Sequence, residues 1–296
     1  HWPSHTRAAW ASSGHTMADV GEILNQALQL GEEERWTEMA EALNTALADV
    51  PDDPYVLCWL GVAERELGRD GVAYEYFKRS WKEDPLDPEL LAMVGAGLAA
   101  FDDPEAEAAL RAAALTGPDV PIARLQYGAY LARNGVFEQA LDNLRAAAEL
   151  DPEDPAIQGE LGIAYALMND FRQAATAMET ALELAPDDSW TRVLLGLVQL
   201  ENNDIEHAAE NLIRAADERL QDGEAQVLAA LAAAVAGWDD AAHQTIARVE
   251  YSAESFDEEL LDEARDRIDE GPEPAREFLT ETVAPVALRE RLTQPL

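Results

Sequence analysis

Two series of residues recur along this chain with one shared period, and that period constrains the fold more than any other feature. One series consists of glycines that interrupt predicted helices: Gly61, Gly95, Gly128, Gly162 and Gly196. The other series consists of prolines: Pro51, Pro85, Pro118, Pro152 and Pro186. Both series are spaced 34, 33, 34 and 34 residues apart, so they share even the one-residue deletion. The chain therefore contains a true internal repeat, which predicts an array of similar units.

Each recurring residue has a local role in a predicted pair of helices. Gly162 and Ala174 are small enough to let the two helices approach closely, which outweighs the ~1 kcal/mol that glycine costs inside a helix. Aspartate followed by proline, as at Asp154 and Pro155, caps a helix and fits its first turn. The residue between the two helices is always one that tolerates the left-handed conformation at a helix end: Gly68, Gly135, Asn169, Asn203 and Gly237.

This pattern resembles the tetratricopeptide repeat, a helix–turn–helix unit of about 34 residues. In one unit the family's recurring positions fall on Leu161, Gly162, Tyr165, Ala174, Met178, Ala181 and Pro186. In the unit that begins at Pro54 they fall on Leu60, Gly61, Ala73, Phe77 and Pro85. The position where the family usually has tryptophan holds Leu57 and Gln158 instead. The resemblance implies an all-α, right-handed superhelical solenoid of tandem helix pairs.

Seven repeats are expected between a short leader and a C-terminal capping segment. The leader, 1–19, is either an expression-vector remnant or a shortened native extension. The repeats cover 20–53, 54–87, 88–120, 121–154, 155–188, 189–222 and 223–256. The remaining residues, 257–296, predict an amphipathic helix over 257–270 and a further short helix broken near Pro285. This segment either caps the open end of the array or folds back into its groove.

The charge of the chain is strongly acidic. Fifty-nine Asp and Glu against twenty-one Lys and Arg give a net charge of −38, which excludes nucleic-acid binding through a basic patch. Lys78 and Lys82 are the only lysines. An acidic, lysine-poor surface is typical of salt-adapted proteins, because the screening length falls to about 3 Å at 1 M salt and mutes self-repulsion. The alternative is an acidic surface that serves a basic partner.

The sequence carries no recognisable catalytic or metal-binding motif. Histidine and cysteine spacings do not fit zinc, the acidic clusters do not fit a calcium loop, and no phosphate-binding glycine loop is present. We therefore expect a non-enzymatic protein with no metal and no cofactor. The single cysteine, Cys58, excludes an intramolecular disulfide, and no apolar run reaches the roughly 18–20 residues of a membrane span. A cytoplasmic location is expected, although an upstream export signal would not be visible.

The resemblance implies that the first helix of each repeat lines a concave groove. The predicted partner-binding residues are Tyr55, Val62, Arg65, Leu125, Ala129, Arg133, Ile163, Trp190, Val193, Leu197, Val227 and Leu231. This wall is apolar and small, and it lacks the cations with which the family clamps a C-terminal carboxylate. The alternative is that the small residues on this wall serve only to tighten the superhelix.

An apolar groove fits an apolar or amphipathic segment, which is a protein partner, a second copy or the chain's own terminus. The sequence thus favours a protein–protein interaction scaffold. The alternative function is an acidic chaperone or decoy that binds a basic protein through its carboxylates.

Overall fold

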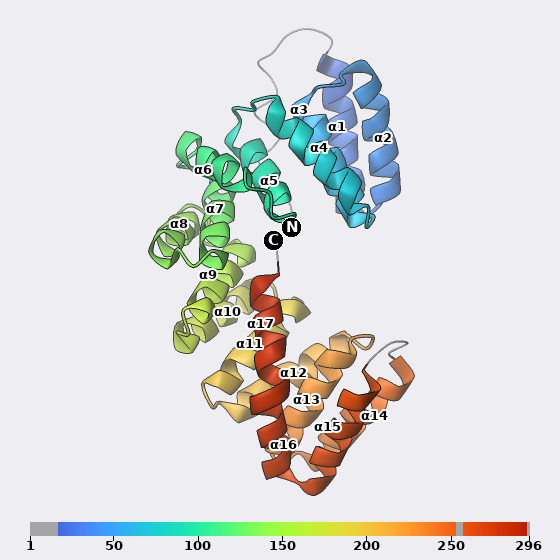
Figure 1. Cartoon of the computed structure of the whole chain (residues 1–296), viewed down its shortest axis with the longest axis vertical. Helices are drawn as coiled ribbons and strands as arrows, with labels where there is room; N and C mark the ends of the chain where they lie inside the picture. The colour runs from blue at the N-terminus through green and yellow to red at the C-terminus, as the bar shows by residue number, and fades with distance from the viewer. Residues whose placement is uncertain (1–16, 253–256, 295–296) are drawn as a thin grey trace. The chain divides into compact units, whose positions relative to one another are not determined.

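The computed structural model describes residues 17–252 and 257–294, and all regular structure in these residues is helical (Figure 1). Residues 1–16 of the expected leader and the last four residues of the seventh repeat lie outside the described residues. The first helix, α1, begins at Met17, three residues before the expected start of the first repeat.

Helices follow one another in pairs along the chain. The early ones are α1 (Met17–Glu32), α2 (Trp36–Asp49), α3 (Pro54–Glu66), α4 (Asp70–Lys82), α5 (Pro88–Ala99) and α6 (Ala106–Thr116). The middle ones are α7 (Pro121–Arg133), α8 (Phe137–Leu150), α9 (Pro155–Leu167) and α10 (Phe171–Leu184). The later ones are α11 (Ser189–Glu201), α12 (Ile205–Glu218), α13 (Gly223–Val235) and α14 (Asp239–Ser252). The C-terminal ones are α15 (Glu258–Glu270), α16 (Pro272–Phe278), the π-helical turn η2 (Leu279–Val283) and α17 (Ala284–Thr293).

Capping and turn residues set the helix boundaries as the sequence predicts. The Asp154 carboxylate accepts a hydrogen bond from the Ala156 backbone N–H at 2.9 Å, and Pro155 occupies the first turn of α9. The predicted turn residues all adopt a left-handed φ, between 58° and 79°. In two pairs that lack glycine or asparagine there, Glu34 and Asp102 take the same conformation.

The mid-helix glycines are packing residues, as predicted for Gly162. A Cβ added at Gly162 would lie 2.6 Å from Cγ of Met178 on the second helix of the pair. A Cβ added at Gly196 would likewise lie 2.6 Å from Cγ of Leu212. Because real Cβ contacts are never this short, glycine is what allows the paired helices to approach so closely.

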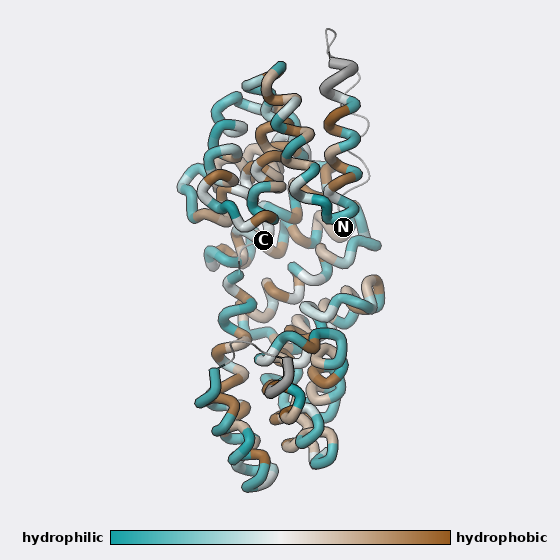
Figure 2. Tube along the Cα trace, turned by 90° about the vertical axis from the view of Figure 1, so that its right-hand side faces the viewer, coloured by the Kyte–Doolittle hydropathy of each residue, from teal (hydrophilic) through white to brown (hydrophobic). Residues whose placement is uncertain are grey.

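The chain divides into two compact units. Unit 1 consists of residues up to Leu131 together with Asp142–Leu150, and unit 2 of Ala132–Leu141 and Asp151–Gln294. Each unit has its own buried apolar cluster. Apolar and hydrophilic residues alternate along most helices (Figure 2), as expected for helices that bury one face.

The C-terminal segment of unit 2 begins with a helix that covers the last helix pair. Helix α15 packs against both helices of that pair, α13 and α14.

After α15, Gly271 adopts a φ of 116°, which only glycine takes readily, and the chain turns into α16. The predicted break near Pro285 is the π turn η2, where the Ala284 N–H bonds the carbonyl of Leu279 five residues earlier. A widened turn accommodates a proline, which lacks the N–H that the helix needs.

Candidate functional site

The first helices of unit 2 form an inner wall that is covered by the C-terminal segment. We use "inner wall" for the surface of α9, α11 and α13 on which α16, η2 and α17 lie. Helix α17 packs against α11 and α9, while α16 and η2 pack against α13 (Figure 1). Every residue of α11 from 191 to 200 is buried. A helix that is buried all round has neighbours on every side, and here α10, α12 and α17 are among them.

Six of the predicted groove residues lie on these three helices. Val193, Leu197, Val227 and Leu231 are fully buried, and Ile163 is nearly so. They belong to one apolar cluster with Leu288 and Leu292 of α17, and Trp190 packs half-buried against the same cluster. The structure therefore brings these predicted residues together in one cluster, which also contains residues of the chain's own C-terminal helices.

The other predicted groove residues lie elsewhere. Tyr55, Val62 and Arg65 are on α3, and Leu125 and Ala129 are on the part of α7 that belongs to unit 1. Val62, Leu125 and Ala129 are buried, and Tyr55 and Arg65 are partly buried. Arg65 lies 3.7 Å from the carboxylate of Glu66. Burial, with the negative charge and hydrogen bonding of Asp87, raises the pKa of Tyr55 well above its usual value. Tyr55 therefore stays neutral across the physiological range.

Helix α17 meets the inner wall with a narrow apolar face. Ala284, Ala287, Leu288 and Leu292 are buried, with the three- and four-residue spacing of one helix face. Val286, on another face of the same helix, is 52% exposed. Two alanines and two leucines thus make the contact surface, which lets the helix backbone lie close to the wall.

Two polar contacts flank this apolar face. Arg291 of α17 pairs with the carboxylate of Glu224 in the first turn of α13. Arg133 holds Glu160 of α9 through two parallel hydrogen bonds of 2.7 and 3.0 Å. Its Nε–H also donates to the backbone carbonyl of Gln294, at the end of α17, at 2.9 Å. These contacts fix the helix in register along the wall.

Of the residues in these contacts, only Arg133 was among the predicted site residues, from its position in the repeat. Glu160, Glu224, Arg291 and Gln294 were not. The available signal for Glu160 is a single carboxylate within the apolar stretch PAIQGELGIAYAL. That carboxylate is buried, and a buried charge needs a charged partner.

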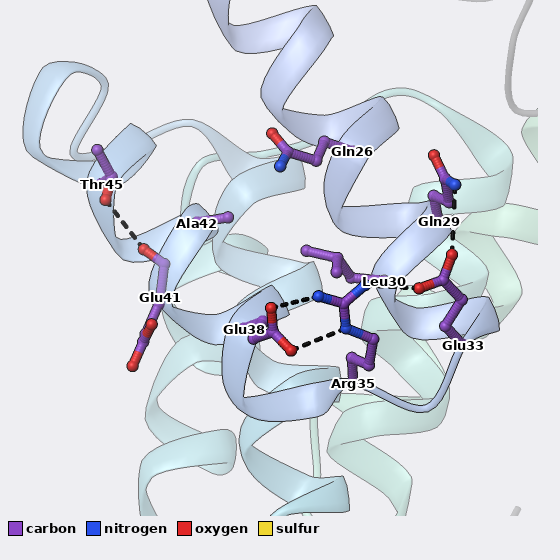
Figure 3. Close-up of a pocket in the computed structure, with 9 residues that line it drawn as sticks. All are labelled: Gln26, Gln29, Leu30, Glu33, Arg35, Glu38, Glu41, Ala42 and Thr45. Carbon is purple, nitrogen blue, oxygen red and sulfur yellow. Dashed lines mark hydrogen bonds and ion pairs between the residues drawn. The ribbon is translucent and has the colours of Figure 1, made fainter.

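A separate polar hollow of about 440 Å³ lies between α1 and α2 of unit 1. Arg35 sits there with its guanidinium turned to Glu38 on one side and Glu33 on the other (Figure 3). Hydrogen bonds from Arg35 lower the pKa of both carboxylates. All three side chains are about half-exposed, so this is a surface ion-pair network with little net energy.

A buried ion pair joins two helix pairs within unit 1. The Lys78 ammonium lies 2.7 Å from the Asp103 carboxylate, which is 2% exposed, and also contacts Glu105. Tyr74 donates its hydroxyl to the same Asp103 carboxylate at 2.7 Å. Burial, the largest single influence, raises the pKa of Asp103, but the hydrogen bonds from Lys78, the Glu105 backbone N–H and Tyr74 together outweigh it, so the pKa is lowered. One of the two lysines of the chain thus has a structural position.

Other kinds of site are not found in the described part of the chain. There, no group of three or more His, Cys, Asp or Glu side chains is arranged to hold a metal ion. Cys58 is fully buried, which raises the pKa of its thiol far above neutrality and leaves it unreactive. None of the helices in residues 17–252 and 257–294 is both long and apolar enough to cross a membrane.

Comparisons with known proteins agree with this architecture. Family models described as tetratricopeptide repeat match residues 24–88 and 131–189. No curated protein sequence matches the chain.

Three solved structures illustrate the likeness. The APC/C hetero-tetramer Cut9–Hcn1 aligns with 18% identity and a TM-score of 0.67, over 82% of this chain and 48% of the matched one. The chain thus spans about half the length of that protein. PilW, a type IV pilus biogenesis factor, aligns with 18% identity and a TM-score of 0.58, over 69% of this chain and 94% of its own.

A thermophilic repeat protein from Thermus thermophilus is 25% identical over 60% of this chain and 98% of its own, with a TM-score of 0.51. The repeat period, the paired helices, the packing glycines and the two family matches lead to one conclusion. The chain is a tetratricopeptide repeat protein.

Proposed function

We propose that the protein is a non-enzymatic interaction scaffold that binds an amphipathic helix on the inner wall of unit 2, in exchange with its own α17. The observation that carries this proposal is the packing of α17: its buried leucines and alanines belong to one apolar cluster with Ile163, Val193 and Leu197. A surface that accepts one short amphipathic helix has the shape and chemistry to accept another.

The family supports the general class of function. Tetratricopeptide repeat proteins generally act as protein-interaction scaffolds, and helix-in-groove recognition relies on anchor residues spaced three and four apart. Leu288 and Leu292 have this spacing. The partner we propose therefore presents a short apolar face of leucine and small residues. A second copy of the chain, which carries the same helix, is one protein that meets this description.

The test uses a fluorescent peptide of residues 272–294 and the full chain in concentrated potassium chloride. Leu288→Asp combined with Leu292→Asp should lift α17 from the wall, because two carboxylates cannot stay in an apolar cluster. We expect this variant to bind the peptide while the wild type binds it at least tenfold more weakly.

Val286→Asp is the control for an added carboxylate, since it places one at an exposed position of the same helix. It should bind the peptide as weakly as the wild type. Circular dichroism must show that the open variant keeps its helices. If the variant with Leu288→Asp and Leu292→Asp keeps its helices but does not bind the peptide, the inner wall does not exchange α17 for another helix.

A second function rests on a different observation, the net charge of −38. Under this alternative the protein is an acidic chaperone or decoy that holds a basic protein through its exposed carboxylates. Salt separates the two proposals, because electrostatic capture weakens as screening rises while apolar binding persists or strengthens. We also expect thermal stability to rise between dilute buffer and about 2 M potassium chloride, as screening mutes self-repulsion. A constant midpoint would remove the proposed salt adaptation.

A further inference from the structure

We propose that the inner wall selects its helix by charge and by direction: Glu224 takes a cation from the last turns of the helix, and Arg133 takes its C-terminal carbonyl. This inference rests on the proposed function and names the partner class for the same site. The preferred partner is an amphipathic helix with a leucine and alanine face and an arginine near its C-terminal end. In α17 these features are Leu288, Leu292, Arg291 and Gln294.

Arg133 is built to meet the end of a helix. Two of its N–H groups are held by Glu160, which fixes the plane of the guanidinium. Its Nε–H then points at the carbonyl of Gln294. Gln294 follows the last residue of α17, and its ψ of 135° turns its carbonyl off the helix axis, so this carbonyl has no partner within the helix and accepts from Arg133 instead. A cation at this position therefore favours a helix that ends here.

The surroundings of Arg133 strengthen this preference. The Arg133 and Glu160 side chains are 15% and 10% exposed, so water competes weakly for their hydrogen bonds. Glu160 orients the guanidinium from within the repeat array, and α17 contributes nothing to that pair. A helix docked in the opposite direction would place its own N–H donors against this guanidinium, which repels them. Arg133 thereby encodes the direction of the bound helix.

Glu224 provides the charge preference. It lies in the first turn of α13 and pairs with Arg291, whose side chain is only 10% exposed. An arginine this buried needs its carboxylate, because an unpaired buried charge is costly. Arg289, two residues earlier, is exposed and points away from the cluster. The wall thus distinguishes an arginine at one position of the helix from an arginine two residues away.

The charge of α17 agrees with this assignment. Helix α17 carries two arginines and one glutamate, within a chain whose net charge is −38. Helix α15, which covers the end of the array, carries seven carboxylates and two arginines in the sequence EELLDEARDRIDE. Helix α17 is therefore cationic by one charge, whereas the chain as a whole and α15 are acidic.

The first test measures peptide binding to the full chain opened by Leu288→Asp and Leu292→Asp. A peptide of residues 272–294 with Arg291→Gln should bind about ten- to a hundredfold more weakly, the usual effect of losing a hydrogen bond to a charged group. The matched Arg289→Gln peptide should bind like the unchanged one. Equal losses for both peptides would overturn the inference, since the wall would then respond only to total charge.

Charge reversal and direction complete this test. Adding Glu224→Arg to the open chain should abolish binding of the unchanged peptide and restore binding of an Arg291→Glu peptide. Adding Arg133→Gln to the open chain should weaken its binding of the unchanged peptide about tenfold. The Arg291→Gln peptide should still bind more weakly than the Arg289→Gln peptide. Failure of the reversed pair to recover affinity would refute the role of Glu224, and no effect of Arg133→Gln would refute the role of Arg133.

A second measurement keeps this inference separate from the proposed function. Hydrogen exchange of the α17 amides, measured in the otherwise unaltered chain, needs no added partner. Arg133→Gln and Arg291→Gln should each speed this exchange about tenfold, while Arg289→Gln should not. If the peptide never binds but only Arg133→Gln and Arg291→Gln speed the exchange, then Arg133 and Glu224 do select α17, and the proposal that α17 exchanges with a partner is wrong. If the three variants exchange alike, the contacts do not select the helix, whatever the peptide does.

Discussion

The two units fill their interiors with different side chains. The buried cluster of unit 1 contains Trp59 and Phe77, and seven further aromatic residues pack against it. The cluster of unit 2 is built mainly from alanine, valine and leucine, and among the described residues its one fully buried aromatic side chain is Phe278 of α16. Interiors are packed to nearly constant density. Unit 1 therefore fills its volume with large side chains, whereas unit 2 leaves room that an additional helix fills.

The alanines of α13 illustrate the consequence. Ala225, Ala229, Ala230, Ala232, Ala233 and Ala234 are all buried in the cluster of unit 2. Small side chains allow backbones to approach, so an alanine-rich wall stays in contact with solvent or a cavity until another backbone covers it. The C-terminal segment provides that cover. The difference between the units predicts that unit 1 depends on single large residues and unit 2 on its C-terminal segment.

The largest expected effect is in unit 1. Phe77→Ala removes a ring that lies against both Gly61 and Gly97, so it should lower the free energy of unfolding by about 3–5 kcal/mol. Urea denaturation gives the size of the loss, and segment-resolved hydrogen exchange gives its location. Loss of protection in α3 to α5 is expected first. If α11 and α13 lose protection equally, the two units do not differ as described.

In unit 2, Leu288→Ala should cost about 2–5 kcal/mol, because it leaves a cavity beneath α17. Faster exchange is expected in α17 and α11, with α3 unchanged. Val286→Ala, at an exposed site of the same helix, should stay within about 0.5 kcal/mol of the wild type. Similar losses for the two substitutions would mean that α17 contributes through helix propensity and not through its seat.

Unit 1 also offers a pH-dependent test. The lowered pKa of Asp103 means that its charged form stabilises the fold above the pKa it has when unfolded, about 3.9, and that this stability is lost as the pH falls. Lys78→Met leaves the buried carboxylate without its cation and should cost about 1–3 kcal/mol at neutral pH.

The difference between Lys78→Met and the wild type should shrink as the pH falls, because the buried Asp103 carboxylate of the folded variant, having lost its cation, takes up a proton before that of the wild type does. Thermal midpoints measured from pH 3 to pH 7, by roughly one-unit steps across that range, follow this change. A constant difference over the whole range would show that Lys78 acts through packing alone.

The smallest expected effect compares two glycines of α9. Gly162→Ala places a Cβ 2.6 Å from Met178 and should cost about 1–3 kcal/mol, partly offset by better helix propensity. Gly159→Ala meets nothing within 4 Å and should stabilise by up to about 1 kcal/mol. Opposite signs in the melting temperature are expected, and a stabilising Gly162→Ala would contradict the close approach of α9 and α10.

Sequence alone was sufficient for most of the fold. The period placed the helix pairs, and glycine and asparagine at fixed positions predicted the left-handed turns. These features succeed because each depends on contacts within one repeat. Glu34 and Asp102 escaped prediction because the turn geometry, set by the packed pair, imposes a left-handed conformation that carboxylate residues rarely adopt.

The site was harder to predict because its contacts join distant repeats. The sequence allowed the C-terminal segment to be either a cap or a groove occupant, and in the structure α15 packs against α13 and α14 while α17 packs against α11 and α9. Glu160 and Arg291 could not be paired with their partners in advance. Their pairing depends on where α17 lies along the wall, and that register follows from the turn at Gly271 and the π turn η2, which no repeat pattern encodes.

The hydrogen bond between Arg133 and Gln294 joins residues 161 positions apart. Repeat arrays normally fold through contacts between neighbours, so folding can begin anywhere and spread. Closing so long a loop is slow, because its entropy is lost before the contact forms. During synthesis α9, α11 and α13 are made before α17, which follows them in the sequence. The helices of the inner wall therefore exist in the growing chain before the helix that covers them.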